Sequence, residues 1–332
     1  MLTMKKKIAF VTGGYSGEAV ISYESAKTIE AQVDRDQYDL FRIDIRPDGW
    51  FYNPAPGENI LIDKNDFSFS QSGIKTTFDA VLCGIHGTPG EDGKLQGYFE
   101  LIGLPYTACD VACSAITFNK RFTVAVAAFS GIPVSRSLHF YKDDVIHPEK
   151  VLKELKLPLF VKPNNGGSSI GMSKVTESRQ LEAALLKAFK EDDQIIIEEF
   201  ISGIELTIGV YKNAGEITTL PITEIRSKKD FFDYEAKYTT GMAEEITPAP
   251  VEDNIAELIR TQAKKLYHLF NCKGVVRIDF IYNPEEHKAY MLEINTVPGQ
   301  SANSLVPQQV KAAGTTLKAF YSTLIESCLK DK

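Results

Sequence analysis

Two short runs near the end of the chain carry polar side chains at alternating positions. Residues Val275 to Tyr282 and Ala289 to Thr296 are rich in β-branched and aromatic side chains and flank a turn-forming segment, so they predict a β-hairpin. Because side chains of a strand alternate between its two faces, an even pairing register would gather four polar groups within roughly 5 to 8 Å. These groups are the side chains of Arg277, Asp279, Glu293 and Asn295.

Carboxylates gathered next to an amide oxygen are costly to hold together without a counter-ion. Hard oxygen ligands without histidine or cysteine are typical of a Mg²⁺ site, so the hairpin predicts one. The alternative is a solvent-facing sheet with scattered charges.

The composition is that of an ordinary folded protein. The chain has 332 residues, of which 43% are hydrophobic and 24% charged, which suggests two or three domains. Its net charge of -7 argues against a nucleic-acid partner. The apolar run after Lys7 ends at Gly13, too early for a signal peptide, and no later run approaches a membrane span. We therefore expect a cytoplasmic protein without a membrane partner.

The five cysteines suggest neither a zinc site nor a disulfide framework. Cys109 and Cys113 form one Cys-x3-Cys pair, and no Cys-x2-Cys pair is present in the sequence. We expect the cysteines to be reduced and mostly buried.

The beginning of the chain reads as an α/β domain. Lys7 to Val11 predicts a strand that runs into a glycine turn, and Ser22 to Val33 has the composition of a helix. The glycine spacing does not match the dinucleotide fingerprint, so a nicotinamide cofactor is not expected. Further strands are expected at Tyr38 to Ile45 and Phe78 to Ile85. The second of these ends in a glycine-rich loop that contains His86, at the edge where open α/β sheets bind ligands.

The middle of the chain has one predicted helix, Ser114 to Ser130, followed by a lysine beside a Gly/Ser loop. Leu157 to Pro163 predicts a strand that presents Lys162, and the glycine-rich loop after it could lay backbone N–H groups along a polyphosphate. A further strand is expected at Gln194 to Phe200. One apolar helical stripe is expected in the core: Leu181, Ala184, Leu185, Ala188 and Phe189.

The last third combines strands, a long irregular stretch and a helix. Strands are expected at Leu206 to Tyr211 and Glu216 to Glu224. Arg226 to Pro250 lacks periodicity, and its aromatic residues favour a functional lid over disorder. Asp253 to Phe270 predicts an amphipathic helix whose inward residues are Ile255, Leu258, Ile259, Leu266, Leu269 and Phe270.

Six motifs follow one another in an order that is specific as a set, although each is weak alone. They are the glycine turn at Gly13, His86-Gly-x-x-Gly-Glu-Asp-Gly, Val161 to Pro163 with Gly167 to Gly171, Asp233 to Tyr238, Arg277 to Asp279, and Glu293 to Asn295 with Ser304 to Pro307. Taken together they resemble the D-alanine:D-alanine ligase family of the ATP-grasp superfamily, over nearly the whole chain. The resemblance implies an α/β and α+β protein of three domains, with a Rossmann-like N-terminal domain followed by an ATP-grasp fold.

The resemblance also implies domain limits and partners. The N-terminal substrate-binding domain would span residues 1–110, the central ATP-grasp subdomain 111–200, and the C-terminal subdomain 201–332, with the lid at 226–250 and the metal site. The protein would be a cytoplasmic homodimer that makes D-alanyl-D-alanine for peptidoglycan.

Most of the implied site residues belong to ATP and its metal ions. The nucleotide would be held by Lys120, Lys162, Lys237, Glu198 and Glu205. The two Mg²⁺ ions, for which Mn²⁺ could substitute, would be held by Asp279, Glu293 and Asn295. The last set agrees with the spacing of the hairpin.

The remaining implied residues act on D-alanine. One D-alanine carboxylate would attack the γ-phosphate to give an acyl phosphate, and the amine of the second D-alanine would attack that intermediate. Arg277 and the N–H of Gly299 would hold the oxyanion, while Ser304 and Leu305 would receive the carboxylate of the second substrate. His86 would contribute to substrate binding, and Ser168 and Tyr238 to the closed site.

One position departs from the family pattern. The family usually has a second glutamate two residues after the position of Glu18, where it meets the ammonium of the first substrate, and this chain has Val20 there. Glu24, one helical turn beyond Val20, is a candidate replacement, and the alternative is that it is a solvated helix residue.

Two other functions remain open from the sequence. One is a D-alanine:D-lactate or D-alanine:D-serine ligase. Tyr238 argues for the dipeptide instead, because depsipeptide-forming relatives resemble one another in having Phe at this position. An ATP-binding module without ligase activity is the other, and Val20 is the only feature that favours it.

Overall fold

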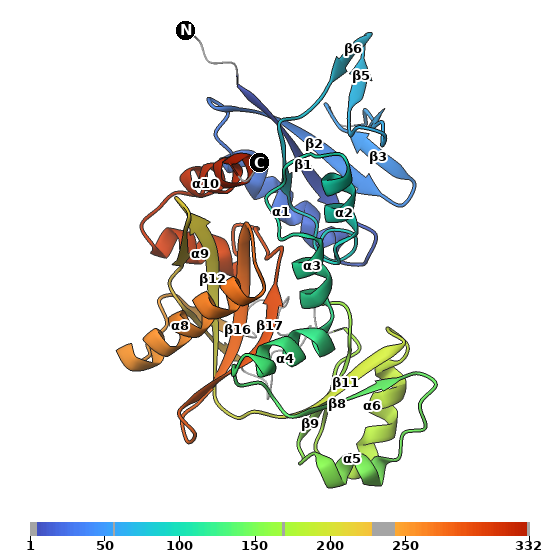
Figure 1. Ribbon diagram of the computed structural model, residues 1–332, viewed down its shortest axis with the longest axis vertical. Helices are drawn as coiled ribbons and strands as arrows, with labels where there is room; N and C mark the ends of the chain where they lie inside the picture. Colours follow the sequence, from blue (N-terminus) through green and yellow to red (C-terminus); the bar gives the residue numbers. More distant parts are fainter. Residues whose placement is uncertain (1–4, 56, 168–169, 228–242, 331–332) are drawn as a thin grey trace.

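The computed structural model describes residues 5–55, 57–167, 170–227 and 243–330 (Figure 1). The chain begins with a mixed sheet of order β4-β3-β2-β1-β7, in which β1 pairs in parallel with both β2 and β7. Its strands are β1 (Lys6–Gly13), β2 (Tyr38–Arg46), β3 (Gly49–Tyr52), β4 (Ile60–Leu61) and β7 (Ala80–Cys83). The strands expected here are confirmed.

Alternate residues of β1 enter two different cores. Ala9 and Val11 pack into an aromatic cluster with Trp50, Phe67 and Phe99 on one face of the sheet. On the other face the strand packs against helices α1 (Ala19–Gln32) and α10 (Leu317–Lys330). Helix α2 (Lys94–Leu101) and the hairpin of β5 (Phe69–Gln71) and β6 (Ile74–Thr76) complete this region.

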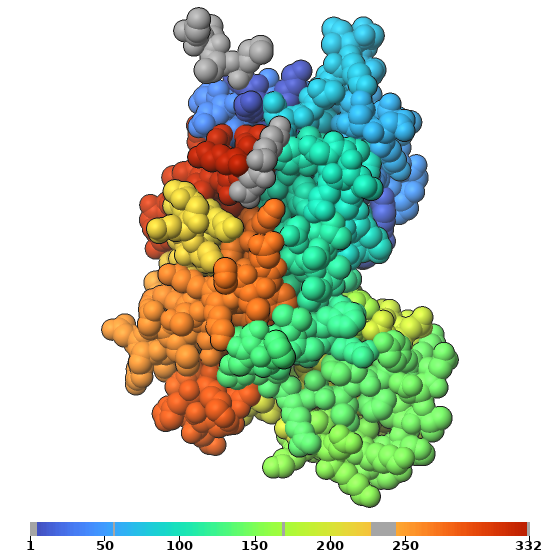
Figure 2. Space-filling model, in the orientation of Figure 1, coloured from blue at the N-terminus to red at the C-terminus, as the bar shows by residue number. Residues whose placement is uncertain are grey.

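The central sheet is antiparallel and forms a lobe of its own at the lower right of Figure 2. Its strands, in the order β10-β9-β11-β8, are β10 (Ser173–Val175), β9 (Leu159–Pro163), β11 (Gln194–Glu199) and β8 (Ser137–Tyr141). The predicted helical stripe is confirmed in α6 (Leu181–Ala188), which packs with α5 (Pro148–Glu154) over this sheet and follows the 3-10 turn η1 (Ser178–Gln180).

The third sheet has the order β15-β14-β12-β16-β17, with β13 paired to β12. Its strands are β12 (Ile204–Asn213), β13 (Glu216–Thr219), β14 (Thr223–Ser227), β15 (Ala243–Ile246), β16 (Val275–Asn283) and β17 (Lys288–Asn295). The predicted amphipathic helix is confirmed as α8 (Asp253–Leu269), which packs on one face of the sheet through Ile259, Ala263 and Leu266. Helix α9 (Leu305–Ala312) also contacts β12.

The prediction of a single helix from Ser114 to Ser130 is wrong. The structure has α3 (Val111–Phe118) and α4 (Lys120–Phe129), separated at Asn119, whose backbone is extended. The side chain of Asn119 accepts a hydrogen bond from the N–H of Phe122 and so caps α4. The apolar pattern runs through the break, which is why periodicity missed it.

The prediction of one strand from Glu216 to Glu224 is also wrong, because β13 and β14 are separate partners of β12. Pro221, which has no N–H to donate, lies between them. In addition, β15 occupies part of the stretch 226–250 that was expected to be irregular, and it pairs with β14. Residues 228–242 of the predicted lid lie outside the described residues.

In the part of the chain that the structure describes, we find no helix with both the length and the apolar composition needed to cross a membrane.

Candidate active site

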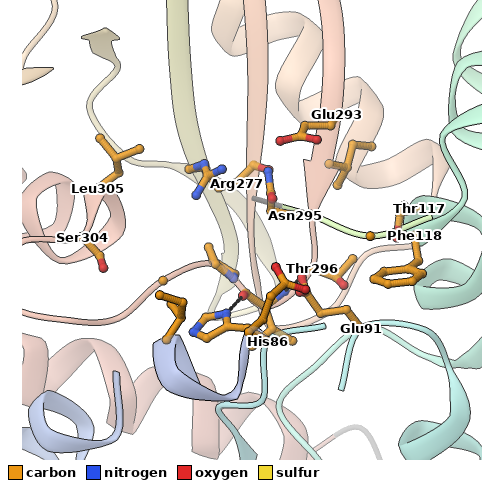
Figure 3. A pocket seen from close by; sticks show the side chains of 18 of the residues that line it. His86, Glu91, Thr117, Phe118, Arg277, Glu293, Asn295, Thr296, Ser304 and Leu305 are labelled. Atoms are coloured by element: carbon orange, nitrogen blue, oxygen red, sulfur yellow. Dashed lines mark hydrogen bonds between the residues drawn. The ribbon is translucent and has the colours of Figure 1, made fainter. Parts of the chain in front are cut away.

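At its polar positions the hairpin of β16 and β17 has the even register that the predicted site requires, and it reaches this register through a shift between Asp279 and Phe280. Arg277 pairs with Asn295, and Asp279 pairs with Glu293. Figure 3 shows Arg277, Asn295 and Glu293 close together beside the cavity. The polar face is therefore real, and the opposite face of the same strands is part of the hydrophobic core.

Within this face Asp279 has its own counter-ion. Arg277 donates to both of its carboxylate oxygens, at 2.9 Å each. Thr207 donates to Oδ1 at 2.5 Å, and the amide of Asn295 donates to Oδ2 at 3.1 Å. Burial opposes the charge of Arg277, but the attraction of Asp279 outweighs it, so the pKa of the guanidinium is raised above its usual value. Arg277 is thus a fixed, fully charged group.

A cavity of about 460 Å³ lies in front of this face and collects residues from distant parts of the chain. Nine of the predicted site residues line it: Glu24, His86, Lys120, Arg277, Glu293, Asn295, Gly299, Ser304 and Leu305. Asp279 lies directly behind it, bonded to Arg277 and Asn295. Ser168, Lys237 and Tyr238 lie outside the described residues.

The helix break at Asn119 places Lys120 at the cavity. The N–H of Lys120 donates to the carbonyl of Asn164 at 3.0 Å, and its ammonium donates to the carbonyl of Gly166 at 2.6 Å. The N–H of Arg121 donates to the side chain of Asn164 at 2.8 Å. The start of α4 and the glycine loop therefore form one unit, which brings a cation beside flexible backbone.

The other predicted nucleotide residues lie on the strands next to this unit. Lys162 on β9 and Glu198 on β11 form a buried ion pair with each other. Glu205 lies on β12, opposite Ile281 of β16. The structure thus brings Lys162 and Glu198 into direct contact, whereas none of the three lines the cavity.

His86 uses both ring nitrogens in contacts with the protein. Nδ1 lies 2.7 Å from the carbonyl of Val297, which can only accept, so Nδ1 carries the proton (Figure 3). Nε2 then accepts from the hydroxyl of Ser25 at 2.9 Å, and Ser25 in turn accepts from the N–H of Gln300 at 3.1 Å. Burial lowers the pKa of His86 to about 4. A neutral His86 thereby holds both sides of the segment that contains Gly299.

Two further carboxylates line the cavity. Sequence reasoning gave Glu91 no role, and it kept Glu18 only as the alternative to Glu24 for the ammonium of the first substrate. Glu91 accepts from the N–H groups of Gly87 at 2.8 Å and Val297 at 3.1 Å. Burial, reinforced by the nearby charge of Glu18, raises the pKa of Glu91 to about 8. Its place in a glycine-rich loop at a strand end was the available signal.

Glu18 lies where two glycine loops approach each other. It stands at the start of α1, and a Cβ added at either Gly87 or Gly167 would collide with its carboxylate. The carboxylate of Glu18 thus lies against both loops, and Gly87 also has a positive φ of 67°, which favours glycine.

Glu24, the predicted substitute for the missing glutamate, lies on α1 and lines the cavity. Its carboxylate bonds to the ammonium of Lys27 at 2.6 Å and is 53% exposed. Val20 on the same helix is 64% exposed. Of these residues, Glu18 is the one whose carboxylate lies against the glycine loops.

The far side of the cavity is formed by the start of α9. Ser304 precedes Leu305, the first residue of the helix, and its hydroxyl lies 2.7 Å from that of Ser301. A Cβ at Gly299 would lie 2.8 Å from this hydroxyl, so the glycine keeps the space open. Gln309 anchors the helix by accepting from the N–H of Gly209 at 2.9 Å. A helix N-terminus held in this way favours an anion such as a carboxylate.

Comparisons with known proteins show the family to which the chain belongs. Residues 7–109 match the family model "D-ala D-ala ligase N-terminus", and residues 120–326 match "D-ala D-ala ligase C-terminus". The D-alanine–D-alanine ligase of Parabacteroides distasonis is 44% identical to the chain, and the match covers 99% of both proteins. The D-alanine–D-alanine ligase of Flavobacterium johnsoniae is 47% identical, and the match covers 98% of this chain and 99% of the relative.

Solved structures give the same result for the fold. The VanG D-Ala:D-Ser ligase from Enterococcus faecalis superimposes with a TM-score of 0.86 at 30% identity, covering 97% of this chain and 99% of that one. The D-alanyl-alanine synthetase A from Vibrio cholerae gives a TM-score of 0.88 at 27% identity, covering 98% and 99%. The fold class expected from the sequence is confirmed. With matches over nearly its whole length to both family models and to these relatives, the chain belongs to the D-alanine–D-alanine ligase family.

Proposed function

We propose that this chain joins two D-alanine molecules into D-alanyl-D-alanine, with conversion of ATP to ADP and phosphate, for the synthesis of peptidoglycan precursors. The observation that carries the proposal is the single cavity that joins Lys120 and its glycine loop to Arg277, Gly299 and Ser304. A phosphoryl donor near Lys120 and a carboxylate near Ser304 would share one cavity, and this proximity is what the transfer of an acyl phosphate requires.

The hairpin face fits divalent metal ions of the hard kind. The donor set is two carboxylates and an amide, whose oxygens suit Mg²⁺ or Mn²⁺. We assign Asp279, Glu293 and Asn295 to two such ions, which when bound would neutralise charge on the phosphates of ATP. Arg277 already balances Asp279, so Glu293 brings the additional negative charge to this face.

The nucleotide would extend from this face toward the central sheet. Lys120 and the loop at Gly166 would meet its phosphates, as would Lys162 and Lys237. Glu198 and Glu205 would meet the adenine and the ribose. The pair of Lys162 with Glu198 keeps the lysine oriented on β9, which supports a role at the mouth of the phosphate site.

The reaction would proceed by two attacks on electrophilic centres. The carboxylate of the first D-alanine attacks the γ-phosphorus, so that the bond to ADP breaks and an acyl phosphate forms. The amine of the second D-alanine then attacks the acyl carbon, and phosphate leaves as the peptide bond forms. Arg277 and the N–H of Gly299 stabilise the tetrahedral oxyanion that forms when the amine adds to the acyl carbon and that collapses when phosphate leaves.

Several contacts prepare the cavity for this sequence. The bidentate contact with Asp279 fixes the guanidinium of Arg277. His86 holds the Gly299 segment through Val297 and Gln300 while staying neutral. Ser304 and the start of α9 receive the carboxylate of the second D-alanine, and the first D-alanine lies toward Glu18. Ser168 and Tyr238 would complete the closed site.

The domain limits at residues 110 and 200, a homodimeric assembly and a location in the cytoplasm are further parts of this proposal. The domain limits and the homodimer follow from membership of the family, and the location follows from the need for ATP.

The test is phosphate release with Mg²⁺ and ATP, followed by mass spectrometry of the product. We expect release that depends on D-alanine and not on L-alanine, and a product that is the dipeptide when D-serine and D-lactate compete. A dominant D-alanyl-D-serine or D-alanyl-D-lactate product would replace the proposal with the corresponding ligase. If the chain binds ATP but releases no phosphate, it is an ATP-binding module without ligase activity.

A further inference from the structure

Three cysteines that are far apart in the sequence meet in the core. Cys109 precedes Asp110, the capping residue of α3, Cys113 lies in the first turn of that helix, and Cys272 lies between α8 and β16. Their sulfur atoms all lie within 4.8 Å of one another, and those of Cys113 and Cys272 are 3.7 Å apart. The three residues are between 0% and 2% exposed. The sequence shows only the close pair Cys109 and Cys113, so the third thiol could not be foreseen.

We propose that these three thiols form a binding site for one soft metal ion in three-coordinate geometry, and that Cu⁺ is the ion it suits. A metal–sulfur bond of about 2.3 Å places the sulfurs of a trigonal site about 4.0 Å apart. The observed separations of 3.7 Å to at most 4.8 Å bracket that value. The thiols could therefore bind one ion with small movements of their side chains.

The number and softness of the donors select the ion. Thiolates favour Cu⁺, Zn²⁺ and iron–sulfur clusters, whereas structural Zn²⁺ is almost always bound by four ligands. Among the residues that the structure describes, the group contains these three thiols and no fourth histidine, cysteine or carboxylate. Because the residues are buried, a water ligand has little access to a fourth position.

Backbone polar groups lie next to the thiols. The thiol of Cys109 can donate to the carbonyl of Lys273 at 3.3 Å. The N–H of Lys273 donates to the sulfur of Cys109 at 3.4 Å. Cys113 also lies at the positive N-terminal end of α3. On binding, the coordinating thiols release their protons to water and metal–sulfur bonds form, with no change of oxidation state.

Occupancy would link two elements next to the candidate active site. Cys272 lies three residues before Val275, where β16 begins, and this strand carries Arg277. Cys109 and Cys113 belong to the start of α3, which contacts β17 (Figure 1). An ion held by all three would fasten α3 to the beginning of the catalytic hairpin, so it should raise the melting temperature.

The experiment uses the full chain with Cys83→Ser and Cys328→Ser, which leaves only the three clustered thiols. The reduced protein is titrated with Cu⁺ without oxygen, in competition with a colorimetric Cu⁺ chelator. We expect one equivalent to be retained, with ultraviolet thiolate-to-metal absorption and a melting temperature that rises by about 2 °C or more. Cys113→Ser in the same background should weaken retention at least tenfold and remove the thermal shift.

Failure of the parent to retain Cu⁺ against the chelator would overturn the proposal, as would equal retention by Cys113→Ser. If the melting curve shows that Cys113→Ser does not fold, Cys272→Ala serves as the second variant with the same expectation. Zn²⁺ is titrated in parallel, and tighter retention of Zn²⁺ than of Cu⁺ would contradict the three-coordinate assignment. X-ray absorption should show three sulfur neighbours around copper.

Discussion

At the scale of single residues, buried His86 and half-buried Glu91 are both held in their neutral forms near pH 7. Burial lowers the pKa of His86 to about 4 and raises that of Glu91 to about 8. Both bond to Val297, His86 to its carbonyl and Glu91 to its N–H. Together they hold the segment that leads to Gly299, without adding charge to a site that must accept anions.

Glu91 makes stability depend on pH in a defined direction. The unfolded chain releases the Glu91 proton near pH 4.5, whereas the folded protein keeps it up to about pH 8, so the folded state binds more protons in between. Unfolding free energy therefore falls as pH rises through this window. His86 is mostly neutral in both states above pH 7 and contributes little there.

We expect the parent to lose about 1 kcal/mol more stability than Glu91→Gln between about pH 7 and pH 9. Urea unfolding of both proteins at the two pH values measures the difference. A parallel loss in both proteins would show that Glu91 is already ionised at neutral pH.

The first-substrate ammonium needs a carboxylate, and two candidates lie on one side of the cavity. Glu18 lies against the glycine loops, while Glu24 is paired with Lys27. A charge-assisted hydrogen bond contributes about 1.5 to 3 kcal/mol, so loss of the true partner should weaken first-site D-alanine binding roughly ten- to a hundredfold. We expect this loss in Glu18→Gln, with the KM for ATP nearly unchanged.

Glu24→Gln is the matched variant, since it makes the same chemical change further along helix α1. Both D-alanine constants are measured for each protein. The sequence hypothesis that Glu24 replaces the family glutamate stands if Glu24→Gln has the larger effect on the first site, and it fails if that constant equals the parent's.

At the scale of elements, the break at Asn119 between α3 and α4 shapes the candidate nucleotide site. It lets the loop of Asn164 to Gly166 bond to the first residues of α4. Sequence periodicity could not reveal it, because the partner loop lies more than forty residues away. An asparagine in an apolar helical pattern is a weak signal of a cap.

Asn119→Ala should cost about 1 kcal/mol of stability through the lost cap and should also raise the KM for ATP, because Lys120 follows the capping residue. Asp110→Ala is the control, since Asp110 caps α3 by accepting from Cys113 at 2.9 Å. It should show a similar loss of stability with little change in the KM for ATP. Equal KM values for ATP in both variants would show that the helix break has no effect on nucleotide binding.

The two strands of the hairpin could be predicted from the sequence, because period-two alternation fixes the faces of each strand. Their register could not, because the turn pairs Phe280 with Met291, and only a register shift between Asp279 and Phe280 brings Asp279 opposite Glu293. The separation of β13 from β14 and the addition of β15 depend on pairing with distant strands, which local patterns do not encode. Glu91 was missed for a related reason, because its raised pKa comes from burial by the whole fold.

At the scale of the whole molecule, the last helix ties the two ends of the chain together. Phe320 of α10 is 2% exposed and packs with Tyr211 of β12, in the same cluster as Ile8 and Phe10 of the first strand. The hydroxyl of Tyr38 donates to Glu326 of α10 at 2.9 Å.

Phe320→Ala should lower the unfolding free energy by about 3–5 kcal/mol, because it empties a packed site between the first and last sheets. Phe129→Ala is the control at a side chain that is 95% exposed, and its effect should stay within about 0.5 kcal/mol. Denaturant unfolding compares them. Similar values for the two variants would contradict the packing of α10 between these regions.

The central claim is that the polar face of β16 and β17 carries out the phosphoryl and acyl transfer, and Glu293→Gln tests it most directly. This change removes a charge from the face with almost no change in volume. Glu285→Gln, in the exposed turn of the same hairpin, is the matched control. D-alanine-dependent phosphate release with Mg²⁺ is measured for the parent and both variants, with melting curves to show that each is folded. We predict that Glu293→Gln loses turnover while its melting temperature stays close to the parent's and Glu285→Gln remains active; turnover of Glu293→Gln within a few-fold of the parent would contradict the account.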